Sequence, residues 1–388
     1  MELFKSWIKE DGPRLQGSRD LDSSKLQSPC IVRLPSGGYR LFYTAIGPAK
    51  PYPDCQGYIL SAASKDGLTF EKEPGVRLAP QPKIPHMSLR VISPSVAACS
   101  DGRWRMYFES RGPADIPTVI CSAISSDMLH WELEEGIRFQ APGGVGGVRY
   151  LALPNGRGRF YCFESVYGSG GPSHGLRTSQ RIVSAITSDG LHFEKEPGDR
   201  VLDRQSEYDS AGITTGEVIA PTDASGPWTM FLSAWQVPAP GAVVPVHPSH
   251  DVEAIANGRS ADFAAASIAA DMSGFRSRIF VSRSTDGLTW GPLELVLEGV
   301  GYGGDGLDAV HAEDMSLIQT APGRYRMYYA ACDARGRWCV ASAINGVLWP
   351  GPPNAVKESS PQCVSPSVEL NTRPVVLQRH RPQQMRRL

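Results

Sequence analysis

Carboxylates at two places in this 388-residue chain have the types and spacing that acid–base chemistry needs. Glu217 lies among small and apolar neighbours, and Asp305, Asp308, Glu313 and Asp314 form a dense acidic run further along the chain. Facing carboxyl groups can act as proton donor and acceptor, and clustered carboxylates can hold an oxygen-liganded cation such as calcium. Both places are candidate functional sites, with a backbone contact for Glu217 and a structural network for the acidic run as the alternatives.

Basic side chains occur near two of the predicted strands. Arg90 lies close to His86, ahead of one apolar run, and Arg149 lies on another. Arg binds a carboxylate or a phosphate through paired hydrogen bonds, so these residues can contact a ligand. Ion pairs at the surface or between repeats are the alternative. Glu164 stands in a Phe-Glu-Ser stretch that also occurs at Glu109, and a repeated stretch favours a structural role.

An internal repeat positions these candidates. Four segments share a Ser/Thr-x-Asp-x-Leu-x-aromatic pattern, and a degenerate fifth has Asn in place of Asp. The turn residues are separated by 61, 62, 97 and 59 residues and are Asp66, Asp127, Asp189, Asp286 and Asn345. Four intervals define five units. Because Asp accepts backbone hydrogen bonds in tight turns, the motif predicts a repeated structural turn rather than repeated active sites.

Each unit also has an aromatic strand upstream of its turn, at residues 39–45, 104–110, 159–165, 228–234 and 325–331. A shorter apolar run precedes each of these strands, and a third strand leads into the turn. A short fourth strand is expected near Val76, Ile137, Val201 and Leu295. Four antiparallel strands repeated radially form a propeller blade. The sequence therefore predicts an all-β, five-bladed β-propeller with four antiparallel strands per blade.

The predicted propeller spans residues 26–350. Residues 1–25 form an N-terminal segment that can close the ring. Residues 351–388 form a C-terminal extension that ends in a basic tail, and its segment 363–370 is the alternative closing strand.

The longest interval between turns contains an insertion in the fourth blade, at residues 236–278. Long insertions often serve as lids over sites. This one carries His247, His250 and Asp251 at a spacing that resembles a metal site, and an Ala-rich stretch that predicts a helix at residues 260–272.

Composition excludes several classes of function. The formal net charge is −1 and the isoelectric point is about 6.7, so no global field attracts nucleic acid or an anionic membrane. The first residues lack the apolar core of a signal peptide, and no stretch is apolar enough to span a bilayer. The eight cysteines include no CxxC pair and mostly lie in strand-like runs, which favours buried thiols. We expect a cytoplasmic protein.

The five units, the Asp-Gly-Leu turn before the fourth strand and the Ser-Pro of the inner strands resemble the superfamily of five-bladed glycoside hydrolases. That superfamily contains arabinanases, xylosidases, invertases and levansucrases, and the resemblance covers residues 26–349. It implies a central pocket with a base from the first blade, a pKa modulator from the third and a general acid Glu from the fourth. Glycoside hydrolysis needs two carboxyl groups that face each other across the bond.

Counting back from the aromatic strands carries the family's positions onto this chain. Glu217 falls where the general acid stands, and His311 matches a histidine that helps to hold an axial cation. Ser28 stands where the family has Asp, and the third-blade position falls near Gly147 and Val148, without a carboxylate. The family's base and modulator are therefore missing at these positions.

The resemblance implies an enzyme that acts on a sugar or glycoside-like small molecule, with Glu217 as general acid and Asp314 or Glu313 as its partner. A calcium ion on the axis near His311 is the cofactor that would suit the acidic run. The predicted substrate contacts are Ser28, His86, Arg90, Arg149 and Glu164. Two alternatives remain open: phosphorolysis, elimination or cyclisation in the same pocket, and a non-catalytic propeller that binds a glycan or a protein.

Overall fold

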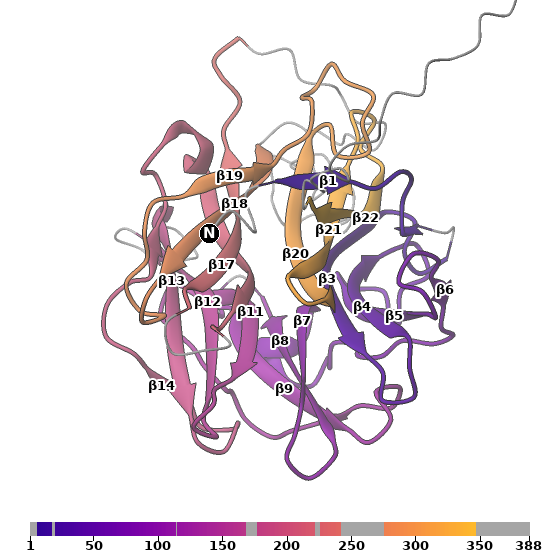
Figure 1. Ribbon diagram of the computed structural model, residues 1–388. Coiled ribbons are helices and arrows are strands. Elements are labelled where there is room, and N and C mark those ends of the chain that lie inside the picture. The colour runs from indigo at the N-terminus through magenta and orange to yellow at the C-terminus, as the bar shows by residue number, and fades with distance from the viewer. Residues whose placement is uncertain are drawn as a thin grey trace, which may run out of the picture. The chain divides into compact units, whose positions relative to one another are not determined.

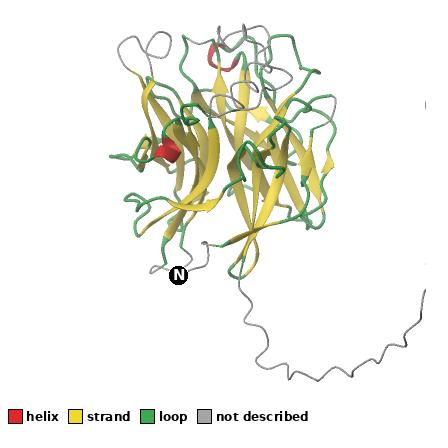
Figure 2. Cartoon of the chain, turned by 90° about the horizontal axis from the view of Figure 1, so that it is seen from above, coloured by secondary structure: helices red, strands yellow, loops and turns green. Residues whose placement is uncertain are grey.

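The computed structural model describes residues 6–17, 20–113, 115–167, 177–221, 226–241 and 275–346. Within these ranges the regular structure is almost entirely β-strand (Figure 2), with two single-turn 3-10 helices, η1 (Pro85–Met87) and η2 (Glu207–Asp209). No helix in the described ranges is long and apolar enough to cross a membrane. The prediction of an all-β fold is confirmed.

The strands form antiparallel meanders in which chain neighbours pair (Figure 1). The first meander contains β3 to β6, which span Lys25–Arg33, Tyr39–Ile46, Tyr58–Ser64 and Glu71–Lys72. The second contains β7 to β10, which span Arg90–Ala98, Trp104–Arg111, Val119–Ser125 and Glu132–Leu133. The third contains β11 to β15, which span Val145–Ala152, Gly158–Tyr167, Arg177–Thr187, Glu194–Lys195 and Val201–Leu202.

The last two meanders share one sheet. The fourth contains β16 to β19, which span Gly212–Ile219, Trp228–Gln236, Arg276–Ser284 and Glu294–Leu297. The fifth contains β20 to β22, which span His311–Ala321, Arg324–Cys332 and Trp338–Asn345. A single parallel pair, Ser277 with His311, joins the two. The short strands β1 (Trp7–Lys9) and β2 (Leu15–Gln16) pair with β22, so the N-terminal segment supplies the outer strand of the fifth meander.

In the first three meanders the outer strands lie closer to their turns than the sequence indicated, whereas that of the fourth lies where it was expected. In the first two meanders they are β6 and β10, several residues before Val76 and Ile137, and the chain returns to the sheet only at isolated bridges. In the third meander Val201 begins a separate strand, β15, and in the fourth Leu295 lies within β19. The difference arises because the chain leaves the sheet at the Glu-Pro or Glu-Glu pair that follows β6, β10 and β14 and then rejoins it.

The inner strands of the meanders surround an axis. Among the described residues β3 contacts β7, β7 contacts β11, β11 contacts β16, β16 contacts β20, and β20 contacts β3 again. Tyrosines on the second strands reinforce this closed succession, because each donates a hydrogen bond to the turn of the next meander. The pairs are Tyr107 with Gly190 (2.9 Å), Tyr161 with Gly287 (2.8 Å) and, across the closure, Tyr328 with Gly67 (2.8 Å).

The repeated turns are built as the motif predicts. Asp286 is typical: its Oδ1 accepts the backbone N–H groups of Leu288 and Thr289, both at 2.7 Å, and the hydroxyl of Ser284 at 2.8 Å. These donors favour the ionised carboxylate, so they hold the pKa of Asp286 below its usual range. The equivalent residues Asp66, Asp127 and Asp189 accept the same set of backbone bonds. The motif therefore has a structural role.

A second repeated contact fixes the outer strands. An Arg of the second strand pairs with a Glu that follows the outer strand, and a Ser of the third strand donates to the same Glu. The ion pairs are Arg40 with Glu73 (2.7 Å), Arg105 with Glu134 (2.8 Å), Arg159 with Glu196 (2.7 Å) and Arg326 with Glu10 (2.8 Å). Because Glu10 follows β1, the N-terminal segment occupies the position that the other meanders fill with their own chain.

Most of the predicted insertion in the fourth meander lies outside the described residues. This applies to His247, His250 and Asp251 and to the predicted helix at residues 260–272. The C-terminal extension from residue 347 onward also lies outside the described part.

Candidate functional site

Each inner strand has a β-bulge at the same step of its register against the second strand. In four strands a residue within the bulge has a left-handed backbone: Ser28 (φ 50°), Ser93 (φ 54°), Gly147 (φ 60°) and Asp314 (φ 49°). This conformation costs a non-glycine residue roughly 1–2 kcal/mol, and bulges often re-aim side chains beside active sites. The cost is incurred at three non-glycine residues that meet at the axis, which marks this level of the propeller as the place to look for function.

Asp314 is the centre of the polar contacts at this level. Its Oδ2 accepts the hydroxyl of Ser28 at 2.6 Å, and its backbone N–H donates to the hydroxyl of Ser233 at 2.8 Å. The Ser28 hydroxyl also lies 3.3 Å from that of Ser93. Ser28 and Ser93 are buried, whereas Asp314 keeps partial exposure. Three inner strands thus bring two hydroxyls to one accessible carboxylate.

Glu109, on β8, supplies a second carboxylate at this level. It is 5% exposed, accepts the backbone N–H of Gly147 at 3.2 Å, and lies 3.8 Å from the guanidinium of Arg90. Burial raises the pKa of Glu109, Arg90 opposes that rise, and the negative charge of Asp314 adds to it. Glu109 therefore lies within the electrostatic reach of Asp314. We name Ser28, Ser93, Glu109 and Asp314 the axial cluster.

Glu109 is the site residue that sequence reasoning assigned to structure. The Phe-Glu-Ser stretches at Glu109 and Glu164 look equivalent, but their registers differ by one residue. Glu109 pairs with Ile92, whereas Phe163 occupies the corresponding position opposite Gly146. A one-residue offset places a side chain on the other face of a strand, so Glu109 reaches the axis and Glu164 does not. The glycine at 146 is a usable signal, because a Cβ there would collide with the Glu109 carboxylate.

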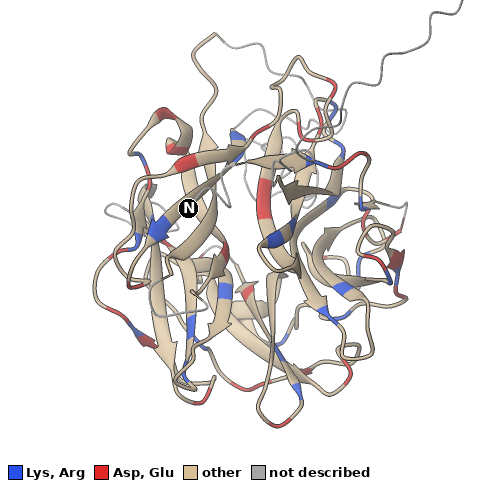
Figure 3. Cartoon of the chain, in the orientation of Figure 1, with Lys and Arg blue, Asp and Glu red and all other residues tan. Residues whose placement is uncertain are grey.

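Arg149 is the first residue to pair with β12 after the bulge of β11. Its side chain is buried, and its guanidinium donates to backbone carbonyls of the other four inner strands. The acceptors are Pro94 (2.7 Å), Pro29 (3.0 Å), Met315 (3.3 Å) and Gly216. Figure 3 shows the acidic part of β20 in red and the basic part of β11, which carries Arg149, in blue. The donors of Arg149 are directed to the scaffold, at the point where the inner strands are nearest to the axis.

Glu217 lies in the same layer as Arg149, at a position that repeats around the axis. At this position a side chain on one inner strand accepts a backbone N–H of the next. The pairs are Cys30 with Val96 (3.4 Å), Ser95 with Tyr150 (2.9 Å), Glu217 with Leu317 (3.3 Å) and Ser316 with Ile31 (3.3 Å). We name Cys30, Ser95, Arg149, Glu217 and Ser316 the axial ring. Burial raises the pKa of Glu217, and the charge of Arg149 opposes that rise.

Glu313 and His311 point between the fourth and fifth meanders. Glu313 accepts the indole N–H of Trp235 at 2.8 Å. His311 is fully buried, lies 3.0 Å from the Ser277 hydroxyl through Nδ1, and stacks on Trp338 with ring centroids 5.2 Å apart. The described residues contain no group of three or more His, Cys, Asp or Glu side chains arranged to hold a metal ion. His311, enclosed by aromatic rings, does not present the open ligand set that an axial calcium ion would need.

The remaining predicted ligand contacts are spread over the same end of the sheets. Arg90 faces Glu109, as described above. His86, on η1, lines an apolar cavity of about 530 Å³ near the start of β11, and burial lowers its pKa. Glu164 pairs with Lys195 (2.5 Å) and Arg181 (3.1 Å) beside a smaller cavity of about 240 Å³. Of the predicted set, the structure joins Ser28 to Asp314 by a hydrogen bond, places Arg90 beside Glu109, and binds Arg149 to the backbone next to Glu217.

No protein-family model matches the chain, and no curated protein matches its sequence. Solved structures of glycoside hydrolases do match its fold. One structure described as a glycoside hydrolase aligns with a TM-score of 0.60 at 13% identity, covering 92% of this chain and 96% of the other. A β-1,2-mannobiose phosphorylase from Listeria innocua, in complex with β-1,2-mannobiose, aligns at 0.59 and 14% identity, covering 87% and 96%.

A third similar structure is from the GH130 family of mannoside phosphorylases. That family contains glycoside hydrolases that target β-1,2-mannosidic linkages in Candida mannan. This structure aligns with a TM-score of 0.58 at 12% identity and covers 88% of this chain and 94% of the other. At these identities the similarity establishes the propeller fold and leaves the reaction to the residues of this chain.

The axial cluster supplies two carboxyl groups in unlike surroundings. Asp314 is partly exposed and receives a hydroxyl donor, whereas Glu109 is buried and has a raised pKa. Pairs of carboxyl groups whose environments differ in this way can divide the roles of proton donor and acceptor. The hydroxyls of Ser28 and Ser93 add donors that can orient either Asp314 or a bound polar group.

Proposed function

We propose that this protein is a glycoside-active enzyme with a five-bladed propeller whose site is the axial cluster. The observation that carries the proposal is Asp314, a partly exposed carboxylate in a left-handed bulge, joined by hydrogen bonds to residues of the first and fourth meanders. The closed succession of inner strand contacts supports the count of five blades. The similarity in fold to glycoside hydrolases and to a mannobiose phosphorylase supports a sugar as substrate.

In this proposal Asp314 exchanges a proton with the glycosidic oxygen or with the attacking group. Ser28 orients the Asp314 carboxylate, and Arg90 holds Glu109 in place through their ion pair. Arg149 positions the inner strands and does not contact substrate, because its donors are engaged by carbonyls.

The assignment of Glu217 as general acid stays a prediction. Its raised pKa supports that role, since a general acid must be protonated near the working pH. Its place in the axial ring, where Cys30, Ser95 and Ser316 make the same contact, favours a role in holding the strands together. Glu313 stays a predicted partner, held by Trp235.

Phosphorolysis is the second candidate reaction. Arg90, beside Glu109, is a cation at the level of the axial cluster that could attract inorganic phosphate, and mannoside phosphorylases share the fold. A cytoplasmic location and the lack of a nucleic-acid partner stay predictions from composition.

Turnover of a panel of neutral glycosides, including β-1,2-mannobiose, with and without inorganic phosphate, tests the proposal. We expect cleavage of at least one glycoside, and Asp314→Asn should lower kcat by roughly 10²–10⁴-fold with an unchanged circular dichroism spectrum. Strict dependence on phosphate would identify a phosphorylase. Full activity of Asp314→Asn together with loss of activity in Glu217→Gln would move the acid to Glu217.

A further inference from the structure

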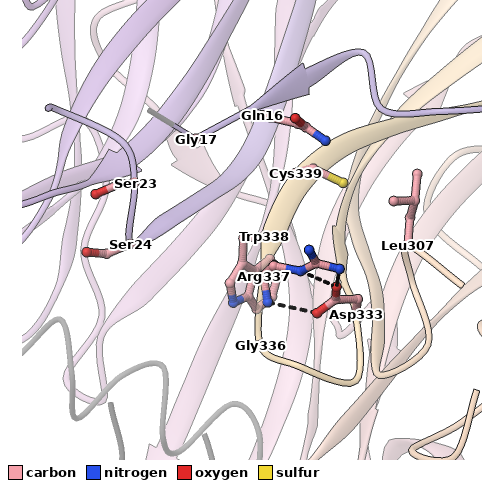
Figure 4. A pocket seen from close by; sticks show the side chains of 10 residues that line it. All are labelled: Gln16, Gly17, Ser23, Ser24, Leu307, Asp333, Gly336, Arg337, Trp338 and Cys339. Carbon is pink, nitrogen blue, oxygen red and sulfur yellow. Dashed lines mark hydrogen bonds and ion pairs between the residues drawn. The ribbon is translucent and has the colours of Figure 1, made fainter. Parts of the chain in front are cut away.

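A polar cavity of about 410 Å³ lies between the N-terminal segment and the loop that joins β21 to β22 (Figure 4). Gln16, Ser23 and Ser24 line it from the N-terminal side, and Asp333, Arg337 and Trp338 line it from the loop side. Its volume falls within the range of about 300–1,000 Å³ that small-molecule sites occupy. We name it the Trp338 pocket.

The loop side of the pocket is rigidly built. Oδ1 of Asp333 accepts the backbone N–H groups of Arg335 and Arg337, both at 2.9 Å, and Oδ2 accepts Nε of Arg337 at 2.7 Å. Gly336 has φ 77°, the left-handed conformation that lets the loop turn back to Asp333. The guanidinium of Arg337 is therefore held in place although its side chain is 71% exposed. Rigid polar groups of this kind give a site its specificity.

Trp338 contributes an edge rather than a face. One side of its ring stacks on His311, with an angle of 13° between the planes, and the ammonium of Lys25 lies 4.4 Å from the ring centroid. The residue is 5% exposed, and its indole N–H has no hydrogen-bond partner among the described residues. The indole nitrogen is shielded from solvent, so Trp338 borders the pocket through another part of its ring edge.

The charges of the pocket favour a neutral ligand. Asp333 neutralises Arg337, and the other polar groups are the amide of Gln16 and the hydroxyls of Ser23 and Ser24. Figure 4 shows these serines on the opposite side of Trp338 from Leu307. Because the Asp333–Arg337 pair has no net charge, the lining has no excess positive charge for an anion, whereas a molecule with several hydroxyl groups can both donate to and accept from it.

Two inner strands, β3 and β20, carry residues that contact Trp338 and residues at the axial cluster. Lys25 stands two residues before Gln27, whose amide is 3.5 Å from Asp314, and His311 stands three residues before Asp314 on β20. We propose that the Trp338 pocket is a second binding site for a neutral glycosyl unit, with the guanidinium of Arg337 and the amide of Gln16 as its donors. That this unit belongs to the same glycoside as the one at Asp314 rests on the proposed function.

The indole N–H resonances of the protein labelled with 15N-tryptophan test this inference. Trp338 is assigned from its disappearance in Trp338→Phe, and the probes are D-mannose, D-glucose and D-galactose, with D-glucuronate and inorganic phosphate as charged comparisons. We expect a saturable shift of the Trp338 resonance with at least one neutral hexose. Trp290 is the internal control, because its indole N–H also lacks a partner among the described residues but lies in another meander.

A matched variant keeps the test open if Trp338→Phe does not fold. Arg337→Met removes one donor while the Oδ1 contacts of Asp333 still hold the loop, and it should weaken the neutral sugar about tenfold. Equal shifts of Trp338 and Trp290, a response only to phosphate or glucuronate, or no response to any hexose would overturn the inference.

The outcome is separable from that of the proposed function. Asp314→Asn should abolish turnover and leave the shift of Trp338 with a hexose unchanged. A hexose shift in a protein that cleaves no glycoside would retain the pocket and reject the proposed function. Turnover without any hexose shift would retain the proposed function and reject the pocket.

Discussion

Replacing Arg149 by methionine should destabilise the propeller more than any exposed substitution. The guanidinium is 5% exposed and donates to carbonyls of four different inner strands, so it links the strands at their closest approach. Methionine fills similar space but donates nothing. The variant leaves those carbonyls without their donor and leaves Glu217 without the opposing charge that restrains its pKa.

The expected loss can be bounded from these contacts. Removing one partner of a buried, hydrogen-bonded charge costs about 3–5 kcal/mol. One kilocalorie per mole corresponds to about 2 °C in Tm for a domain of this size, so Arg149→Met should melt roughly 6–10 °C below the wild type. Arg149→Lys keeps the charge but cannot reach carbonyls on four strands at once, and its Tm should lie between the two.

Differential scanning calorimetry, together with urea unfolding, measures this effect. Arg103→Met is the matched control, since Arg103 forms an exposed ion pair with Asp101 at 2.8 Å and its loss should leave the Tm close to that of the wild type. A Tm for Arg149→Met as close to that of the wild type as that of Arg103→Met would refute the role of Arg149 as the axial link.

Three further substitutions test other parts of the account. Glu217→Gln should raise stability more at about pH 7 than at about pH 5. Burial raises the folded pKa of Glu217, so the contribution of this group to stability is fully present below its ordinary pKa of about 4.3 and is lost as pH rises through the folded value. Urea midpoints at both pH values measure this, and a larger gain at pH 5 would contradict it. Asp286→Ala should cost about 1 kcal/mol through its lost backbone contacts, and Tm equal to that of the wild type would argue against the turn role. Gly146→Ala should cost about 1–3 kcal/mol, because the new methyl group collides with Glu109, and unchanged Tm and kcat would remove that contact from the account.

The architecture was readable because two signatures repeat at a spacing of about 60 residues, interrupted once by the insertion in the fourth meander. The Asp turns and the aromatic strands place the second and third strands of the meanders, and the same hydrogen bonds recur at Asp66 and Asp286. Outer strands of two residues, such as β6, carry too little pattern to be located in this way.

The candidate site was only partly readable because it depends on bulges. One extra residue in an inner strand changes which side chain faces the axis, and no residue type announces it: Ser28, Ser93, Gly147 and Asp314 all adopt it. Counting from the aromatic strands therefore located Glu217 but could not show that it shares its register with Ser316 and the other members of the axial ring.

Arg149 and Glu109 show the same limit of sequence reasoning. Arg149 was predicted to contact a ligand, and Glu109 was assigned a structural role. An Arg on an inner strand is compatible with binding an anion or with binding backbone carbonyls, and only the convergence of four strands selects the second. Glu109 resembled a repeated structural residue until the pairing of β12 placed Phe163 at its equivalent position.

The central claim is that a sugar binds at the axial cluster, and a crystal structure of Asp314→Asn soaked with the glycoside that the wild type cleaves tests it most directly. We predict a sugar ring at the axis, with its glycosidic oxygen within hydrogen-bond distance of residue 314 and its hydroxyls near Ser28 and Glu109. A sugar bound only away from the axis, with residue 314 touching nothing but Ser28 and its neighbours, would contradict the account.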